Sequence, residues 1–321
     1  MTQTIDAAAF QQMVIHAAAA ISAQKQHIND LNVFPVPDGD TGTNMSLTIS
    51  AAAAELKKKQ CATVGEAAQT AASALLRGAR GNSGVILSLL FRGIAKSLKD
   101  RETIDGRDLA IALDFGVAAA YKAVMKPAEG TILTVSRLAA AQAAAAAREE
   151  NAAESVLEAA IREGQEALAD TINQNPVLKK AGVVDAGGKG FLVILQGMLD
   201  SLRGEPMPQV EEESAPADKA DFVAMAAEDI TFAFDTVFIV RKHTEEVDLE
   251  PFRTYLNSIG DSLVIGEDDT AFKVHVHTNT PGAALTESQK YGTLELAKIE
   301  NMRTQADDLA AGKHVQSTDD L

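Results

Sequence analysis

The sequence predicts a multidomain protein in which an all-α domain is followed by a small α+β domain. Residues 10–202 are rich in Ala, and their apolar side chains recur at the 3.6-residue period of helices. Residues 203–221 lose this period and gain proline and acidic residues. Beyond residue 221, apolar and polar side chains alternate, which is typical of half-buried strands.

Eight helical stretches account for the first domain. Small residues allow helices to approach closely, so the Ala-rich composition favours a compact bundle. A coiled coil is excluded because no heptad pattern is sustained along the chain. We expect these helices at residues 8–27, 45–59, 66–78, 83–98, 107–125, 130–149, 152–173 and 187–202.

The second domain is expected at residues 222–305, after a linker at residues 203–221. The linker contains three prolines and the acidic run Glu211–Glu213, a composition that does not pack into a core. The element order β-α-β-β-α-β predicts a ferredoxin-like sandwich, and residues 306–321 form a polar tail. The expected strands are residues 231–240, 262–266, 271–278 and 293–298, and the expected helices are residues 248–258 and 281–291.

Composition narrows the class of protein. The formal net charge of -16 argues against nucleic acid or an anionic membrane as the main partner. Cys61 is the single cysteine, so an internal disulfide is impossible and a reducing compartment is natural. Because we find neither a signal peptide pattern nor an apolar run long enough to span a bilayer, we expect no membrane insertion and a cytoplasmic location.

The most informative motif runs from Asn32 to Met45. Pro35 and Pro37 stiffen the chain, and the Gly between Asp38 and Asp40 permits a tight bend. Both carboxylates can therefore converge on one hard cation such as Mg²⁺. The alternative interpretation is a solvated turn followed by a helix N-cap.

Phosphate groups could be bound by two segments near these carboxylates. A helix beginning at Asn44 would offer free backbone N–H groups, with Thr41, Gly42 and Thr43 leading into it. A second cradle is formed by the glycine-flanked sequence Gly81, Asn82, Ser83 and Gly84. For Ser83, plain N-capping is the alternative.

The sequence resembles the dihydroxyacetone kinase L-type (DhaL) family, and most of all its bacterial fatty acid kinase branch, the ATP-binding FakA proteins. Four segments carry the resemblance in the expected order: Asn32–Met45, Gly78–Ile86, Pro127–Leu133 and Val184–Gly190. Together they cover roughly the first 200 residues. A weaker resemblance to the middle domain of the FakA proteins extends through His275–Asn279.

This resemblance implies an antiparallel eight-helix barrel that binds ATP and Mg²⁺ through loops at one end. It makes Asp38 and Asp40 the catalytic, metal-binding carboxylates. Around the nucleotide it places Thr41, Gly42, Thr43, Asn44, Gly81, Asn82, Ser83, Gly84, Gly130, Thr131, Asp185 and Gly187. Ile132 and Leu133 could face the adenine, although ordinary core packing is the stronger interpretation. The dihydroxyacetone kinase branch uses a third acidic ligand upstream; here Asn32, with Asp30 nearby, occupies that region, and Asn32 could equally stabilise the turn.

His275 and His277 lie two residues apart on an expected strand and therefore point to the same face. Imidazole suits Zn²⁺. In the family's middle domain a Cys on the first strand is expected to join such a pair, whereas this chain has Asp235 at the matching position. We therefore consider zinc bound by Asp235, His275 and His277, with a hydrogen-bonded or interface pair as the alternative.

Three functional hypotheses remain. The first is the ATP-binding component of a two-part kinase that phosphorylates a fatty acid carboxylate held by a carrier protein, in phospholipid metabolism. The second is the nucleotide-binding component of a dihydroxyacetone (glycerone) kinase. The third is a non-catalytic nucleotide-sensing or scaffold module. In each case, the strands of the second domain have edges that need covering, so we expect a homodimer through that domain.

Overall fold

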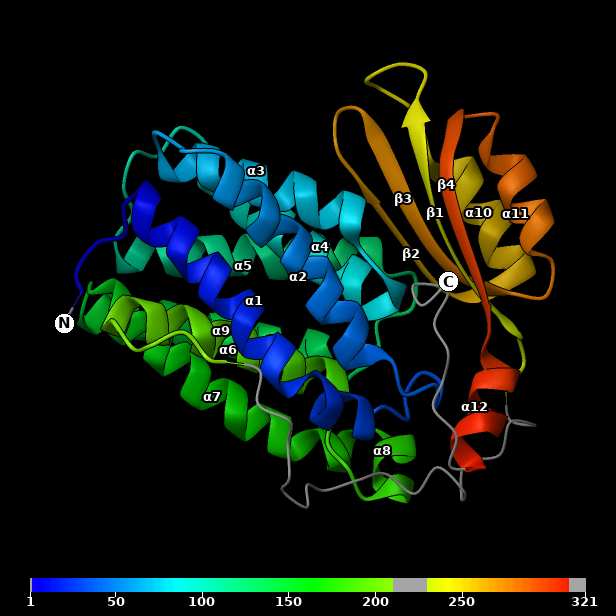
Figure 1. Cartoon of the computed structure of the whole chain (residues 1–321), viewed down its shortest axis with the longest axis horizontal. Helices are drawn as coiled ribbons and strands as arrows, with labels where there is room; N and C mark the ends of the chain where they lie inside the picture. Colours follow the sequence, from blue (N-terminus) through cyan, green and yellow to red (C-terminus); the bar gives the residue numbers. More distant parts are fainter. Residues whose placement is uncertain (1, 210–229, 312–321) are drawn as a thin grey trace.

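The computed structural model describes residues 2–209 and 230–311 and contains the two expected parts (Figure 1). The first is a set of long helices, and the second is a sheet with two helices on one of its faces. Most of the expected linker lies outside the described residues. Within the described residues, no helix is both long and apolar enough to cross a bilayer.

The long helices of the first domain form a closed ring. Each helix packs against the next along the chain, and α9 returns to pack against α1. Their order confirms the expected eight-helix barrel. The helices are α1 (Ala7–Asp30), α2 (Thr41–Lys58), α3 (Val64–Gly78), α4 (Gly81–Ser97), α5 (Gly106–Ala123), α6 (Ile132–Glu149), α7 (Ala153–Gln174) and α9 (Ala186–Arg203).

Polar side chains fix where several of these helices begin. Asp6, Thr63 and Asp185 each accept a hydrogen bond from a backbone N–H in the first turn of the helix that follows. Asp105 and Asp108 form a reciprocal capping box at the start of α5. The expected starts were wrong by as much as four residues at α2, because the helix begins at Thr41 rather than at residue 45.

Sequence reasoning missed one short helix in this domain, α8 (Pro176–Ala181). The Asn175 side chain accepts a hydrogen bond from Val177 N, Pro176 occupies the first turn, and Gly182 ends the helix with a positive φ of 70°. Six residues are too few to show a helical period. Its signal was in the capping residues alone.

The second domain has a four-stranded antiparallel sheet in the order β2-β3-β1-β4. This order, with one helix in each split crossover, confirms the predicted β-α-β-β-α-β arrangement. Phe238, Phe252 and Phe272 form the centre of its core. The elements are β1 (Phe234–Lys242), α10 (Glu250–Ile259), β2 (Gly260–Glu267), β3 (Ala271–Thr278), α11 (Pro281–Ser288) and β4 (Gly292–Asn301).

A further helix, α12 (Met302–Ala310), lies where we expected the polar tail to begin. The Asn301 side chain caps it by accepting hydrogen bonds from Arg303 N and Thr304 N. Met302 and Ala306 are buried against Val36 of the first domain and Ile230. The expected start of the tail at Ala306 was therefore wrong, because these two apolar side chains anchor the segment.

The two domains exchange apolar side chains. Val264 of β2 joins the core of the helical barrel, while Met125, just after α5, packs against the core of the second domain. Lys273 of β3 is buried and donates from Nζ to Arg77 O at the end of α3, at 2.8 Å. The sheet is therefore fixed against the end of the barrel where α3 ends and α4 begins (Figure 1).

The crossing of α4 and α5 gives a test of the barrel. A Cβ atom on Gly93 would lie 2.2 Å from Phe115 O and 2.5 Å from Gly116 Cα. We expect Gly93→Ala to lower the free energy of unfolding by about 3 kcal/mol, because the clashing atoms belong to backbone that cannot move aside. Urea unfolding followed by circular dichroism measures this change.

Gly282→Ala in α11 is the matched control, since no atom lies within 4 Å of the added Cβ. It should change the free energy of unfolding by less than about 1 kcal/mol. Equal midpoints for the wild type and Gly93→Ala would contradict the close crossing.

Candidate active site between the two domains

A pocket lies where the loops at one end of the barrel meet the sheet of the second domain. It encloses about 130 Å³. Eight of the nucleotide-site residues expected from the sequence, together with both candidate catalytic carboxylates, line it: Asp38, Asp40, Thr41, Asn44, Gly81, Asn82, Ser83, Thr131, Asp185 and Gly187. The second domain adds Asp235, Ser262, Val264, His275 and His277.

Asn32 organises the loop that carries the two carboxylates. Its Oδ1 accepts hydrogen bonds from Asp40 N at 3.1 Å, Thr41 N at 2.8 Å and Thr41 Oγ1 at 2.5 Å. Its Nδ2 donates to Val36 O. These bonds give Asn32 the turn-stabilising role that we considered as the alternative. A role as the third magnesium ligand stays a prediction, and it would require Oδ1 to exchange these donors for a cation.

Asp38 and Asp40 are placed where ionisation is costly. Burial raises the pKa of Asp38 well above its ordinary value, and the nearby charges of Asp40 and Asp235 raise it further. Burial, Asp235 and Glu300 raise the pKa of Asp40 to about 7. A divalent cation between these hard oxygen donors would offset the repulsion, so the residues fit a magnesium ion.

The starts of α2 and α4 meet at the pocket. Gly81 has a positive φ of 58°, and a Cβ atom there would lie 2.4 Å from Asn44 Nδ2, so only glycine allows this approach. Helix α4 begins at Gly81 with Arg80 as its N-cap residue, and the capping alternative for Ser83 was therefore wrong. The Oδ1 atom of Asn82 is buried with no hydrogen-bond partner among the described residues.

Four residues expected at the nucleotide do not line this pocket. Gly42 allows α2 to approach Lys25 O of α1, and Gly84 allows α4 to approach the Thr48 hydroxyl of α2. Thr43 pairs with Asn29 through both its N–H and its Oγ1. Gly130, at a positive φ of 73°, donates from N to Thr134 Oγ1 at 2.8 Å. These four residues pack the helices together or hold the loops in place, while the other expected residues line the pocket.

Two further helix starts complete the wall. Thr131 caps α6, and Ile132 and Leu133 are buried core residues that also face the pocket. At the start of α9, Asp185 Oδ2 accepts from Gly188 N at 2.7 Å. Burial raises the pKa of Asp185 to about 6. Residues at four helix N-termini thus line one pocket, and the positive ends of these helix dipoles favour an anionic ligand.

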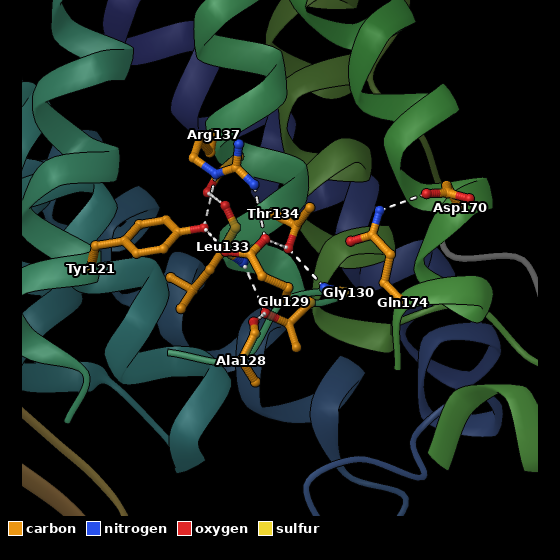
Figure 2. A network of polar contacts seen from close by, with 11 residues as sticks. Tyr121, Ala128, Glu129, Gly130, Leu133, Thr134, Arg137, Asp170 and Gln174 are labelled. Carbon is orange, nitrogen blue, oxygen red and sulfur yellow. Dashed lines mark hydrogen bonds and ion pairs between the residues drawn. The ribbon is translucent and has the colours of Figure 1, made fainter. Parts of the chain in front are cut away.

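A polar network that sequence reasoning missed fixes the loop before α6 (Figure 2). Glu129 accepts hydrogen bonds from Tyr121, Thr134 and Arg137, at 3.1, 2.6 and 2.9 Å. Arg137 also donates from Nε to the Tyr121 hydroxyl. Glu129 was inside the segment quoted for the resemblance, but its partners are on two different helices. No local pattern connects them.

On the second domain, Asp235, His275 and His277 form a buried cluster. One ligand atom from each lies within 4.8 Å of the other two. Burial lowers the pKa of His275, but the Asp235 carboxylate outweighs this, and the net shift is upward. Burial and the neighbouring His275 lower the pKa of His277 to about 3. His275 and His277 thus lie on the same face of β3, as their spacing predicted.

The hydrogen bonding of His275 bears on whether this cluster fits a metal. Its Nδ1 lies 2.9 Å from Ser262 O, a carbonyl that can only accept, so Nδ1 carries the proton and the neutral ring has its lone pair on Nε2. That Nε2 lies 3.1 Å from Asp235 Oδ1, where a protonated ring forms an ion pair with the carboxylate, and neither atom has another hydrogen-bond partner among the described residues. A cation between the two atoms would satisfy both, and the bond to Ser262 O is the outer contact typical of metal-binding His.

Comparisons with known proteins match both halves of the chain. Residues 35–200 match the DAK2 domain, and residues 231–309 match the middle domain of fatty acid kinase FakA-like proteins. Protein YloV of Bacillus subtilis is 43% identical over 94% of this chain and 56% of its own length. An uncharacterised protein of Staphylococcus saprophyticus is 41% identical over 98% of this chain and 58% of its own length. The chain thus spans a little over half the length of these relatives.

Among solved structures, the native dihydroxyacetone kinase of C. freundii aligns with 63% of this chain and 36% of its own, with a TM-score of 0.47 and 21% sequence identity. The two family models match adjacent parts of the chain in the order of its two domains. They confirm the resemblance that the four loop segments indicated. This chain therefore belongs to the DAK2 domain family, and its second domain is a FakA-like middle domain.

Proposed function

We propose that this chain is the ATP-binding component of a two-part kinase, which transfers the terminal phosphoryl group of ATP to a fatty acid carboxylate presented by a carrier protein. The observation that carries the proposal is the convergence of Asp38 and Asp40 with the starts of α2, α4, α6 and α9 around one pocket. Phosphoryl transfer depends on such positioning and charge neutralisation far more than on covalent chemistry by the protein.

The chain's own residues have distinct tasks in this proposal. Asp38 and Asp40 would hold Mg²⁺, which supplies neutralisation of the phosphate charge. The N–H groups at the start of α4 would donate to phosphate oxygens, and Asn44, Asn82 and Ser83 would add side-chain contacts. The second domain, through Val264 and its neighbours, closes one side of the pocket.

The acceptor is the part of the proposal that depends on the middle domain. A FakA-like middle domain supports a carboxylate acceptor on a separate carrier protein over dihydroxyacetone. The products would be ADP and an acyl phosphate. Homodimerisation through the second domain stays a prediction; β4 is an edge strand with Leu296 and Ile299 exposed, and light scattering of the whole chain would decide it.

The first prediction from this site concerns the metal. Without a divalent cation, the buried carboxylates repel a polyphosphate, so Mg²⁺ should tighten ADP binding by at least about tenfold, or 1.4 kcal/mol. In Asp38→Asn and Asp40→Asn this gain should be lost while the helical circular dichroism is unchanged. Calorimetry with Mg²⁺ and then with chelator measures it.

Asp114→Asn, on an exposed position of α5, is the matched control for removing one carboxylate and should keep the full metal dependence. If the wild type binds ADP equally well with Mg²⁺ and with chelator, the proposed metal-nucleotide site is wrong.

A second prediction concerns zinc at Asp235, His275 and His277. After exposure to Zn²⁺ and gel filtration, the whole chain should retain about one equivalent of zinc by elemental analysis, because three buried donors converge there. His275→Ala should lose most of it, whereas the exposed His243→Ala should not. Zinc at trace level in the wild type, or equal retention in both variants, would favour a hydrogen-bonded pair.

A further inference from the structure

The pocket has many acidic residues and almost no basic ones. Asp38, Asp40, Asp185 and Asp235 all line it; Asp40 is half-buried and the other three are buried. Among the described residues that line it, Lys126 is the single Lys or Arg. A nucleotide with three phosphates would bring further negative charge, so the position of this one ammonium group bears on where those phosphates lie.

Lys126 lies at the boundary between two cavities. A second cavity of about 320 Å³ adjoins the pocket, and Phe34, Val124, Lys126 and Ser262 line both. The wall of the second cavity mixes polar side chains with the apolar side chains of Met125, Ile230, Phe232 and Leu263. The carboxylates Asp38 and Asp40 line the first cavity and not the second. Lys126 therefore marks a side of the nucleotide pocket that opens away from the two carboxylates Asp38 and Asp40.

The backbone that carries Lys126 is held from both sides. On one side the second domain holds it, because Arg253 Nη1 donates to Ala123 O at 3.0 Å and Met125 N donates to Leu263 O at 3.3 Å. On the other side, the Glu129 network fixes the residues that precede α6 (Figure 2). The loop between these anchors is short, so its position is set by both domains together.

We propose that Lys126 contacts the terminal phosphate of bound ATP. This inference rests on the proposed function. It assigns a residue that contacts the transferred phosphate and not the two phosphates that stay on ADP. Transfer requires open space beside the terminal phosphate for the acceptor, and the second cavity, which Lys126 also lines, provides such space. In the reaction, a carboxylate oxygen bonds to the terminal phosphorus while the bond from that phosphorus to the bridging oxygen of ADP breaks. The ammonium group stabilises the charge on the transferred group and keeps its proton.

An alternative role, in which Lys126 only balances the charge of Asp261, predicts a different result. Asp261 lines the second cavity, and burial raises the pKa of its carboxyl, while the charge of Lys126 is among the contributions that offset part of this rise. If Lys126 only balanced Asp261, its removal would alter ATP and ADP binding equally. The comparison between the two nucleotides therefore separates the two roles.

The test compares the affinities of a non-hydrolysable ATP analogue and of ADP by calorimetry, both with Mg²⁺. Lys126→Met should weaken binding of the analogue by about tenfold or more, since it loses a charge-assisted hydrogen bond, and should change ADP binding less than about threefold. Lys126→Arg should restore most of the difference. Lys122→Met, at an exposed position in the last turn of α5, is the matched control and should change neither affinity.

The outcomes separate this inference from the proposed function. If the wild type binds neither Mg²⁺-nucleotide, the proposed function fails and Lys126 has no phosphate to contact. If the wild type binds both and Lys126→Met weakens neither, or weakens both equally, the inference about Lys126 is overturned while the proposed function stands. Unchanged circular dichroism in all variants confirms that the comparison concerns binding.

Discussion

The structure depends on the burial of negative charge at the junction of its two domains. Asp38 and Asp40 come from the barrel, while Asp235 and Glu300 come from neighbouring strands of the sheet, and their charges act on one another. Such a concentration is unfavourable in a low-dielectric interior unless cations or protons offset it. The raised pKa values of Asp38 and Asp40 reflect the free-energy cost of ionising these carboxyl groups there. The proposed metal-nucleotide site would offset this cost, because a divalent cation attracts both the carboxylates and the phosphates.

The second domain contributes more than a covering surface. Val264 enters the core of the barrel and Met125 enters the core of the second domain, so neither domain completes its packing alone. The same contact brings β1 and β3 to the pocket with Asp235, His275 and His277 facing it, while Phe272, Val274 and Val276 on β3 face the domain's own core. Because alternate side chains of β3 point to opposite faces of the sheet, this one strand contributes both to the core of the second domain and to the pocket.

Sequence reasoning recovered what periodicity encodes. The eight long helices and the order of the strands follow from patterns that repeat every 3.6 or 2 residues. Local motifs pointed to Asp38, Asp40, Asn82 and Asp185, and the structure brings these residues to one pocket. It missed α8 and α12, whose signals are single caps and two anchoring side chains. Gly42 and Gly84 also serve helix packing, which sequence reasoning did not foresee, because a sequence shows that glycine is needed but not which neighbour requires it. Their place at the nucleotide stays a prediction. Lys126 and the partners of Glu129 could not be found, since their roles arise only when separate elements meet.

The central claim is that Asp38 and Asp40 hold a divalent cation that also contacts the phosphates of a nucleotide. Substituting Mn²⁺ for Mg²⁺ and recording electron–nuclear double resonance with bound ADP tests it most directly, because hyperfine coupling to phosphorus appears only when metal and phosphate are in direct contact. The account predicts phosphorus coupling in the wild-type complex and its loss when both carboxylates are replaced by amides. Phosphorus coupling that persists in that double variant, or protein-bound Mn²⁺ with none in the wild type, would contradict it.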